Sequence, residues 1–235
     1  MGVPGPCGPS SEIFFDKGPE HGKDGGPAID DERFMEIWNL VFMQNIQDEP
    51  YHVIGDLPAK NIDTGAGLER VAVVLQGVDT VFETDLIRPV MATAEGITGV
   101  RYGDHERTDV SLRILADHAK AVTFLISDKV VPSNEGRGYV LRRLLRRAVR
   151  HASLLGVRDL IMPSLIESTV AIMGNAYPEL RQQQDGIVEM AAREETGFRR
   201  TLESGHQLLD AELAKLDDGA VFPGSAAFKL HDTYG

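Results

Sequence analysis

The hydrophobic pattern of the chain changes partway along its length, and this change most limits the folds available to it. Up to about residue 80 the sequence is rich in glycine and proline, and its apolar residues fall in short stretches at 12–15, 34–43 and 51–54, which favours strands. Beyond residue 80, apolar residues recur every three or four positions, as they do on one face of a helix. The sequence therefore predicts an α+β protein whose strands precede a mainly α-helical part.

Three helical segments stand out after residue 80. The first is expected to be capped by Thr84 and to end near Gly99, and the second to begin near Asp109. A third, from 179 to 216, has helical spacing throughout, with possible interruptions at three glycines, Gly186, Gly197 and Gly205. The segment 101–107 is the expected linker between two domains, 1–100 and 106–235.

Composition excludes several classes of protein. The apolar runs are too short to span a bilayer, and the first residues lack the basic and apolar regions of a secretory signal, so a cytosolic protein without a membrane partner is expected. A single cysteine permits neither an internal disulfide nor a cysteine-based zinc site, and the seven histidines show no metal-binding spacing. We therefore predict no metal site formed by these side chains.

The charge of the chain is unevenly distributed. Its 24 basic and 36 acidic residues give a net charge of −12, yet no acidic residue occurs from 136 to 155. Six arginines lie in that segment, most of them at helical spacing opposite an apolar face: Arg137, Arg142, Arg143, Arg146, Arg147 and Arg150. This pattern is typical either of a nucleic-acid-binding surface or of a solvated helix face that pairs with acidic residues elsewhere.

A glycine-rich turn at residues 61–71 joins an extended segment to a helix. Its glycines at 65 and 67 suit either a plain strand-to-helix turn or a phosphate-binding turn, and Arg70 favours the second because a guanidinium can bind phosphate oxygens bidentately. Asp63, just before the turn, is a candidate helix cap or a candidate ligand for a cation.

The residues from Gly65 to Arg70 resemble the third signature motif of class II aminoacyl-tRNA synthetases. Five ordered blocks together resemble the alanyl-tRNA synthetase family within that class, and they span essentially the whole chain: Gly5–Ile13, Glu36–Phe42, Ile62–Gly65, Pro132–Arg143 and His231–Gly235. The resemblance implies part of the antiparallel sheet of a class II catalytic domain in residues 1–100. It also implies a helical domain that recognises the tRNA acceptor stem in 106–235.

The resemblance also implies roles for individual residues in joining alanine to its tRNA through an alanyl-adenylate. Asn39, Val41, Asp63 and Gly65 would bind alanine, with Asp63 holding the ammonium group. Arg70 and Gly67 would bind ATP, and Glu36 is either a contact for Mg²⁺ or a glutamate in a salt bridge. No protein nucleophile is needed, because this reaction relies on positioning and electrostatic stabilisation.

For the RNA, the resemblance implies that Asn134 and Asp232 contact a G·U pair at the third position of the acceptor stem, with the six arginines nearby. Taken by themselves, Asn134 suits a turn and Asp232 a helix cap. The proline and two glycines of residues 131–138 suit a loop that approaches a base closely.

The first signature motif of the family and the ATP-binding arginine of the second would lie upstream of residue 1, and the family's zinc-containing editing domain downstream of residue 235. We therefore expect a fragment that forms adenylate poorly by itself. Two rival functions remain at this point: a non-catalytic RNA-binding module derived from such an enzyme, and a helical scaffold whose arginines bind acidic proteins.

Overall fold

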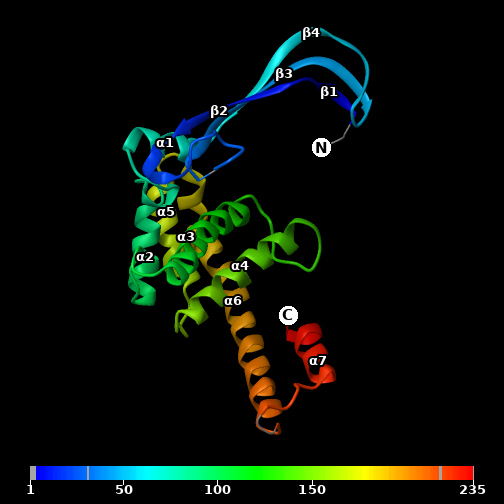
Figure 1. Ribbon diagram of the computed structural model, residues 1–235. Coiled ribbons are helices and arrows are strands. Elements are labelled where there is room, and N and C mark those ends of the chain that lie inside the picture. Colours follow the sequence, from blue (N-terminus) through cyan, green and yellow to red (C-terminus); the bar gives the residue numbers. More distant parts are fainter. Residues whose placement is uncertain (1–3, 31, 217–218, 235) are drawn as a thin grey trace. The chain divides into compact units, whose positions relative to one another are not determined.

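The structure, a computed structural model, describes the backbone of residues 4–30, 32–216 and 219–234, and the side chains as far as residue 230. The chain divides into two compact units, Met1–Asp85 and Leu86–Gly235 (Figure 1). The first contains the sheet and the second is helical, which confirms the predicted α+β class.

The sheet of the first unit is antiparallel, as the resemblance implied. Its described strands are β1 (Gly5–Cys7), β2 (Ser10–Asp16), β3 (Phe34–Glu49) and β4 (His52–Ala66). β3 is the central strand, since β1, β2 and β4 all pair with it. The predicted strand at 51–54 is only the beginning of β4, because the polar residues that follow lack the alternation by which the rest of the strand could be recognised.

A buried arginine organises the segment between β2 and β3. Arg33 is only 6% exposed and binds Asp16 bidentately, with its Nε 2.6 Å from Oδ1 and its Nη2 2.8 Å from Oδ2, and Nη1 donates to Asp24 at 2.6 Å. The bonds from Arg33 to Asp16, with a backbone bond from Gly18, lower the pKa of Asp16 to about 2. The short helix η1 (Pro19–His21) therefore lies in a loop closed by charge-assisted hydrogen bonds.

The rest of the first unit leads out of the sheet. Helix α1 (Leu68–Gln76) follows β4 directly and ends at Gly77 in the left-handed conformation, as glycine commonly does at this position. The short helix η2 (Val81–Glu83) follows. The hydroxyl of Thr84 donates to the carbonyl of Val81, so Thr84 belongs to the end of η2 and does not cap the next helix as predicted.

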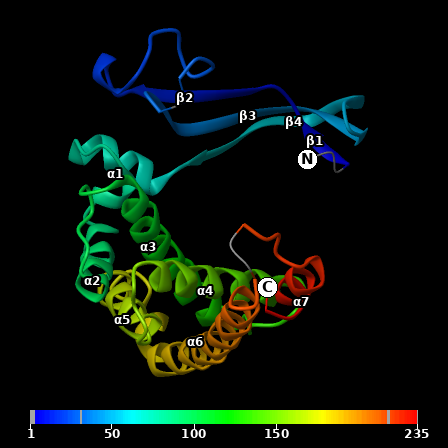
Figure 2. The same cartoon turned by 60° about the horizontal axis from the view of Figure 1, so that its bottom comes forward.

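The second unit consists of six described helices, α2 (Arg88–Thr98), α3 (Glu106–Ser127), α4 (Gly136–Leu154), α5 (Met162–Met173), α6 (Pro178–Leu213) and α7 (Gly224–Tyr234). α3 packs against α2, α4, α5 and α6, and Figure 2 shows it within this bundle. Its buried face includes Leu112, Leu115 and Ala119 at the spacing that the sequence predicted. A buried leucine of this kind contributes about 1.5–3 kcal/mol.

Three features of the helical segments differ from the sequence expectation. α2 belongs to the second compact unit, whereas the predicted domain boundary lay after it, at 101–107. α3 begins at Glu106, three residues before Asp109, because the ring of His105 accepts a hydrogen bond from the amide of Arg107 and caps the helix. α6 is one unbroken helix of 36 residues, and none of its three glycines interrupts it.

Glu195 of α6 shows how the bundle satisfies a buried charge. It is fully buried, and its carboxylate accepts hydrogen bonds from the backbone amides of Ile161 and Met162 at the start of α5. Arg199, one turn further along α6, donates to it at 2.7 and 2.9 Å. A glutamate from one helix thus caps another, which local sequence cannot reveal.

In the part of the chain that the structure describes, no helix is long and apolar enough to cross a membrane.

Candidate functional site

The register of β3 and β4 gathers four predicted site residues on one face of the sheet. Asn39 lies opposite Gly65, and Val41 lies opposite Asp63. Residues two apart on a strand share a face, and directly paired residues on neighbouring strands share it too. These four residues, here called the sheet site, are therefore immediate neighbours although up to 26 positions separate them in the sequence.

The third strand of this face adds a residue that the sequence did not single out. Glu12 of β2 lies opposite Asn39, and its Oε1 accepts a hydrogen bond of 3.2 Å from Asn39 Nδ2. This bond turns the amide oxygen of Asn39 away from Glu12. The feature that identifies Glu12 is the antiparallel pairing of residues 10–16 with 34–41. Its register is known only from the structure.

The sheet site is open. Asp63 is exposed, and a Cβ atom added at Gly65 would have no atom within 4 Å. The Asp63 carboxylate is thus solvated in this chain, and water screens its interactions with other charges. The absence of a side chain at Gly65 keeps free the space above the strand.

Asp63 does not cap a helix, one of the two roles the sequence left open. It lies within β4, and the N-cap of α1 is Gly67, which offers no side-chain hydrogen bond. Neither is Thr64 a cap, because its hydroxyl accepts a hydrogen bond from Trp38 Nε1 on the opposite face of the sheet.

Arg70 and Glu36 meet at the end of the sheet site. Arg70 Nη1 donates to the carbonyl of Glu36 at 2.9 Å and lies 3.4 Å from its Oε2. A Cβ at Gly67 would come within 3.3–3.4 Å of the Arg70 side chain. Gly67 therefore gives this side chain room to turn back over β3. Arg70 remains half exposed, with further guanidinium N–H groups available.

A second group of predicted residues surrounds the loop before α4. Asn134 is exposed at its tip, and its Oδ1 accepts a hydrogen bond from Arg142 Nη1. Ser133 donates its hydroxyl to the carbonyl of Glu135, and its amide bonds to the carbonyl of Gly138. The loop 131–135, here called the recognition loop, is thereby folded back on the first turn of α4.

The two glycines near this loop serve different purposes. Gly136 has a φ of +58°, a left-handed conformation that glycine adopts without strain. Gly138 is buried, and a Cβ there would lie 2.2 Å from the carbonyl oxygen of Val131. Close packing of loop on helix therefore requires a glycine at 138.

The arginines of α4 separate into two sets. Arg142 and Arg146 are partly buried and face α6, where the Nε atom of each lies 3.1 Å from Oε1 of Glu194. The Arg146 guanidinium also lies over the ring of Phe198, 5.1 Å from its centre. These two arginines meet an acidic partner inside the protein, as one of the sequence interpretations expected.

Arg143, Arg147 and Arg150 form the second set, which is exposed, as is Arg137. Within the described side chains no carboxylate forms an ion pair with these four. Burial, and next the charges of Arg147 and Arg150, lower the pKa of His151. Its ring Nδ1 lies 3.0 Å from the hydroxyl of Ser111 on α3. The lowered pKa favours the neutral form of this histidine.

The remaining predicted RNA contact, Asp232, lies in α7, but its side chain is outside the described residues. Nothing in the structure therefore places its carboxylate relative to Asn134.

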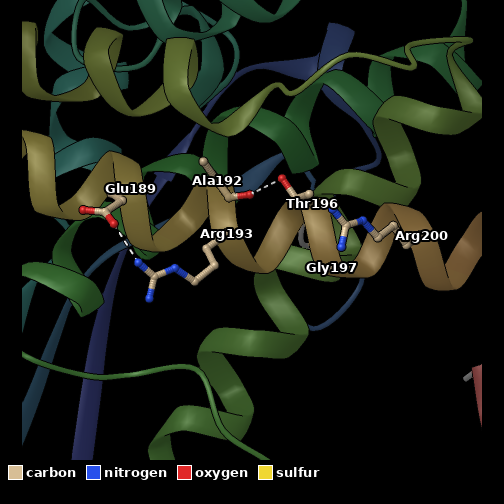
Figure 3. A pocket seen from close by; sticks show the side chains of 6 residues that line it. All are labelled: Glu189, Ala192, Arg193, Thr196, Gly197 and Arg200. Carbon is tan, nitrogen blue, oxygen red and sulfur yellow. Dashed lines mark hydrogen bonds and ion pairs between the residues drawn. The ribbon is translucent and has the colours of Figure 1, made fainter.

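The hollows described elsewhere in the second unit do not contain predicted site residues. One, about 440 Å³, lies along α6, where Glu189 pairs with Arg193 at 2.6 Å and Thr196 donates to the carbonyl of Ala192 (Figure 3). All its lining residues come from a single helix, so it has no second wall to enclose a ligand. Among the described residues, no three His, Cys, Asp or Glu side chains are grouped to hold a metal ion.

Comparisons with known proteins identify the family of the chain. The family model described as tRNA synthetases class II (A) matches residues 1–235. Relatives named alanine–tRNA ligase are 54% identical over 241 residues in Parafrankia sp. (strain EAN1pec), 53% over 242 in Nocardia farcinica and 50% over 243 in Thermobifida fusca. Each comparison covers 100% of this chain and 27% of the relative's length. The chain belongs to the class II (A) family of tRNA synthetases.

Proposed function

We propose that this chain supplies the alanine site and the acceptor-stem recognition surface of an enzyme that joins alanine to its tRNA. The observation that carries the proposal is the β3–β4 register, which brings Asn39, Val41, Asp63 and Gly65 together on one open sheet face. The names of the relatives support the choice of amino acid.

In this proposal Asp63 accepts hydrogen bonds from the alanine ammonium group. Asn39 is held by Glu12, which leaves its amide oxygen to bind the same amino acid. Val41 is the wall beside the methyl group of alanine, and the absence of a side chain at Gly65 leaves room for the substrate. A wall of this kind discriminates by only about 1–3 kcal/mol per methylene, so shape excludes larger side chains better than it excludes glycine or serine.

Arg70 is the proposed ligand for the ATP phosphates. Its Nη1 is held by Glu36, while its other N–H groups remain to donate to phosphate oxygens. Mg²⁺ commonly binds one or two carboxylates together with substrate phosphates, so Glu36 fits an ion that arrives with ATP. Bound there, Mg²⁺ would neutralise phosphate charge.

The chemistry needs no protein nucleophile. The carboxylate of alanine attacks the α-phosphorus of ATP and pyrophosphate leaves, giving the adenylate. A hydroxyl of the terminal adenosine of the tRNA then takes the alanyl group, and AMP leaves. The residues of this chain contribute orientation of the amino acid and electrostatic stabilisation by Arg70.

The acceptor stem is the proposed partner of the second unit. Asn134 at the tip of the recognition loop, together with Asp232, reads the third base pair from the minor groove, which is wide and shallow in A-form RNA. Arg137, Arg143, Arg147 and Arg150 contact phosphates, where they add affinity without sequence preference.

The substitution Asp63→Asn, made in the full-length gene product, tests the alanine site. It keeps the size of the side chain and removes the charge, so the KM for alanine in pyrophosphate exchange should rise about tenfold or more. The KM for ATP should change little. Asp56→Asn is the matched control, because Asp56 is an exposed carboxylate of the same strand that bonds to Asn45 outside the sheet site.

An unchanged KM for alanine in Asp63→Asn would contradict this assignment. Absence of exchange activity in the wild-type full-length protein, with RNA binding intact, would instead favour the non-catalytic RNA-binding module.

A further inference from the structure

A chain of polar contacts links the interior of the helical unit to the tip of the recognition loop. It begins at Glu194 of α6, passes through Arg142 of α4 and ends at Asn134. Its members come from three separate segments, so the fold rather than the local sequence brings them together.

Glu194 is the end of these contacts that is most shielded from water. Its side chain is 14% exposed, and Oε1 lies 3.1 Å from the Nε atoms of both Arg142 and Arg146. The Arg146 contact is a directed hydrogen bond, whereas Arg142 Nε is buried without one. The carboxylate thus holds Arg142 mainly by charge. Such partners stabilise a carboxylate that is largely shielded from water, because a desolvated charge without a partner is destabilising.

Arg142 is the middle of the chain of contacts, and its two terminal nitrogens both point to the recognition loop. Nη1 donates to Asn134 Oδ1, and Nη2 donates to the carbonyl of Pro132 at 3.4 Å. With its Nε end held at Glu194, the planar guanidinium has little freedom to rotate. The loop is therefore positioned by a group that is itself anchored in the bundle.

The contact fixes the orientation of the Asn134 amide. A guanidinium can only donate hydrogen bonds, so Asn134 must direct its carbonyl oxygen toward Arg142. Its Nδ2 group then points away, and within the described residues it has no protein acceptor. The exposed end of Asn134 is consequently a hydrogen-bond donor.

We propose that Glu194 is a positioning residue for base-pair recognition, acting through Arg142 to make Asn134 a donor toward the minor groove. This inference rests on the proposed function of the recognition loop. It assigns Asn134 to acceptor atoms of the base pair and leaves the guanine amino group to a carboxylate. Arg142 therefore affects specificity, whereas Arg143 and Arg147, the proposed phosphate contacts, affect affinity.

The test measures binding of the 235-residue chain to two fluorescein-labelled acceptor-stem hairpins that differ only in a G·U or G·C third pair. Fluorescence anisotropy gives the ratio of the two Kd values. We expect Glu194→Gln and Arg142→Lys each to reduce the preference for G·U about three- to tenfold, toward that of Asn134→Ala. The Kd for the G·C hairpin should change by less than about twofold, because the phosphate contacts remain.

Two variants serve as controls. Glu189→Gln changes another glutamate of α6, whose ion pair among the described side chains is with the exposed Arg193, and should leave both Kd values unchanged. Arg143→Ala should weaken binding to both hairpins equally. In addition, Glu194→Gln should cause no further loss of preference in an Asn134→Ala background, which a general structural role would not predict.

The outcomes separate this inference from the proposed function. Loss of preference in Asn134→Ala but not in Glu194→Gln or Arg142→Lys overturns the positioning role and leaves the base-reading role intact. Equal binding of both hairpins by the wild-type chain overturns both roles. If Glu194→Gln reduces the helical circular dichroism signal, the substitution has disturbed the fold. The positioning role is then tested by Arg142→Lys alone, because Arg142 is partly exposed.

Discussion

At the scale of single residues, two glycines in one motif serve different purposes. Gly65 leaves the sheet site open, and Gly67 leaves room for Arg70. The sequence predicted the strand, the turn and the helix around them. It could not predict these purposes, because they depend on what β3 and the Arg70 side chain place nearby. For the same reason Glu12, the partner of Asn39, was not expected.

The open space at Gly65 leads to a prediction for substrate binding. Gly65→Ala places a methyl group above the strand without meeting a protein atom, so the fold should be retained. The KM for alanine in pyrophosphate exchange by the full-length protein should rise about tenfold, because the added methyl occupies substrate space. Gly55→Ala is the control, since Gly55 lies in the same strand with equally open surroundings. Equal effects of both substitutions on the KM for alanine would contradict the assignment of position 65 to the alanine site.

At the scale of elements, periodicity predicted which segments are helical but not how they end or what they face. The apolar faces of α3 and α4 are those expected from the sequence. By contrast, His105 caps α3 and Glu195 caps α5, and neither role follows from a standard capping pattern. The pairing of Arg142 and Arg146 with Glu194 was hidden because the partners lie about 50 residues apart.

Glycines in helices of the second unit provide a stability test at this scale. Gly186 lies in α6 with no atom within 4 Å of an added Cβ, so Gly186→Ala should stabilise the chain by about 0.5–1 kcal/mol. Gly138→Ala should destabilise it by about 1–3 kcal/mol, because the methyl group would collide with the Val131 carbonyl. Urea unfolding followed by circular dichroism at 222 nm measures both. Stabilisation by Gly138→Ala would show that the loop does not pack closely on α4.

At the scale of the whole molecule, the two compact units differ in how much apolar surface they bury. Among the described residues of the first unit, Val73 is the one buried hydrophobic residue, whereas the second unit has a continuous core from Ile87 to Phe198. The sheet face opposite the sheet site carries exposed Ile13, Trp38, Phe42 and Ile62. Stability should therefore be concentrated in the helices.

Native-state hydrogen exchange tests this difference. Amides in the middle of α3 and α4 should be protected by the full free energy of unfolding, whereas those of β3 and β4 should exchange at least about 100-fold faster through local opening. Mass spectrometry of peptic fragments from the chain resolves the two units. Equal protection would show that they unfold as one cooperative body.

The unbroken α6 sets the distance between the helical core and α7, which contains the proposed RNA contact Asp232. At about 1.5 Å per residue, its 36 residues extend roughly 54 Å, and α7 packs against it beyond the core. Each residue gained or lost after Phe198 would shift α7 about 1.5 Å along the axis and turn it by about 100°. An insertion or deletion in this part of α6 therefore keeps the orientation of α7 only if it adds or removes a near-whole number of helical turns. Insertions or deletions of one or two residues should consequently be poorly tolerated there.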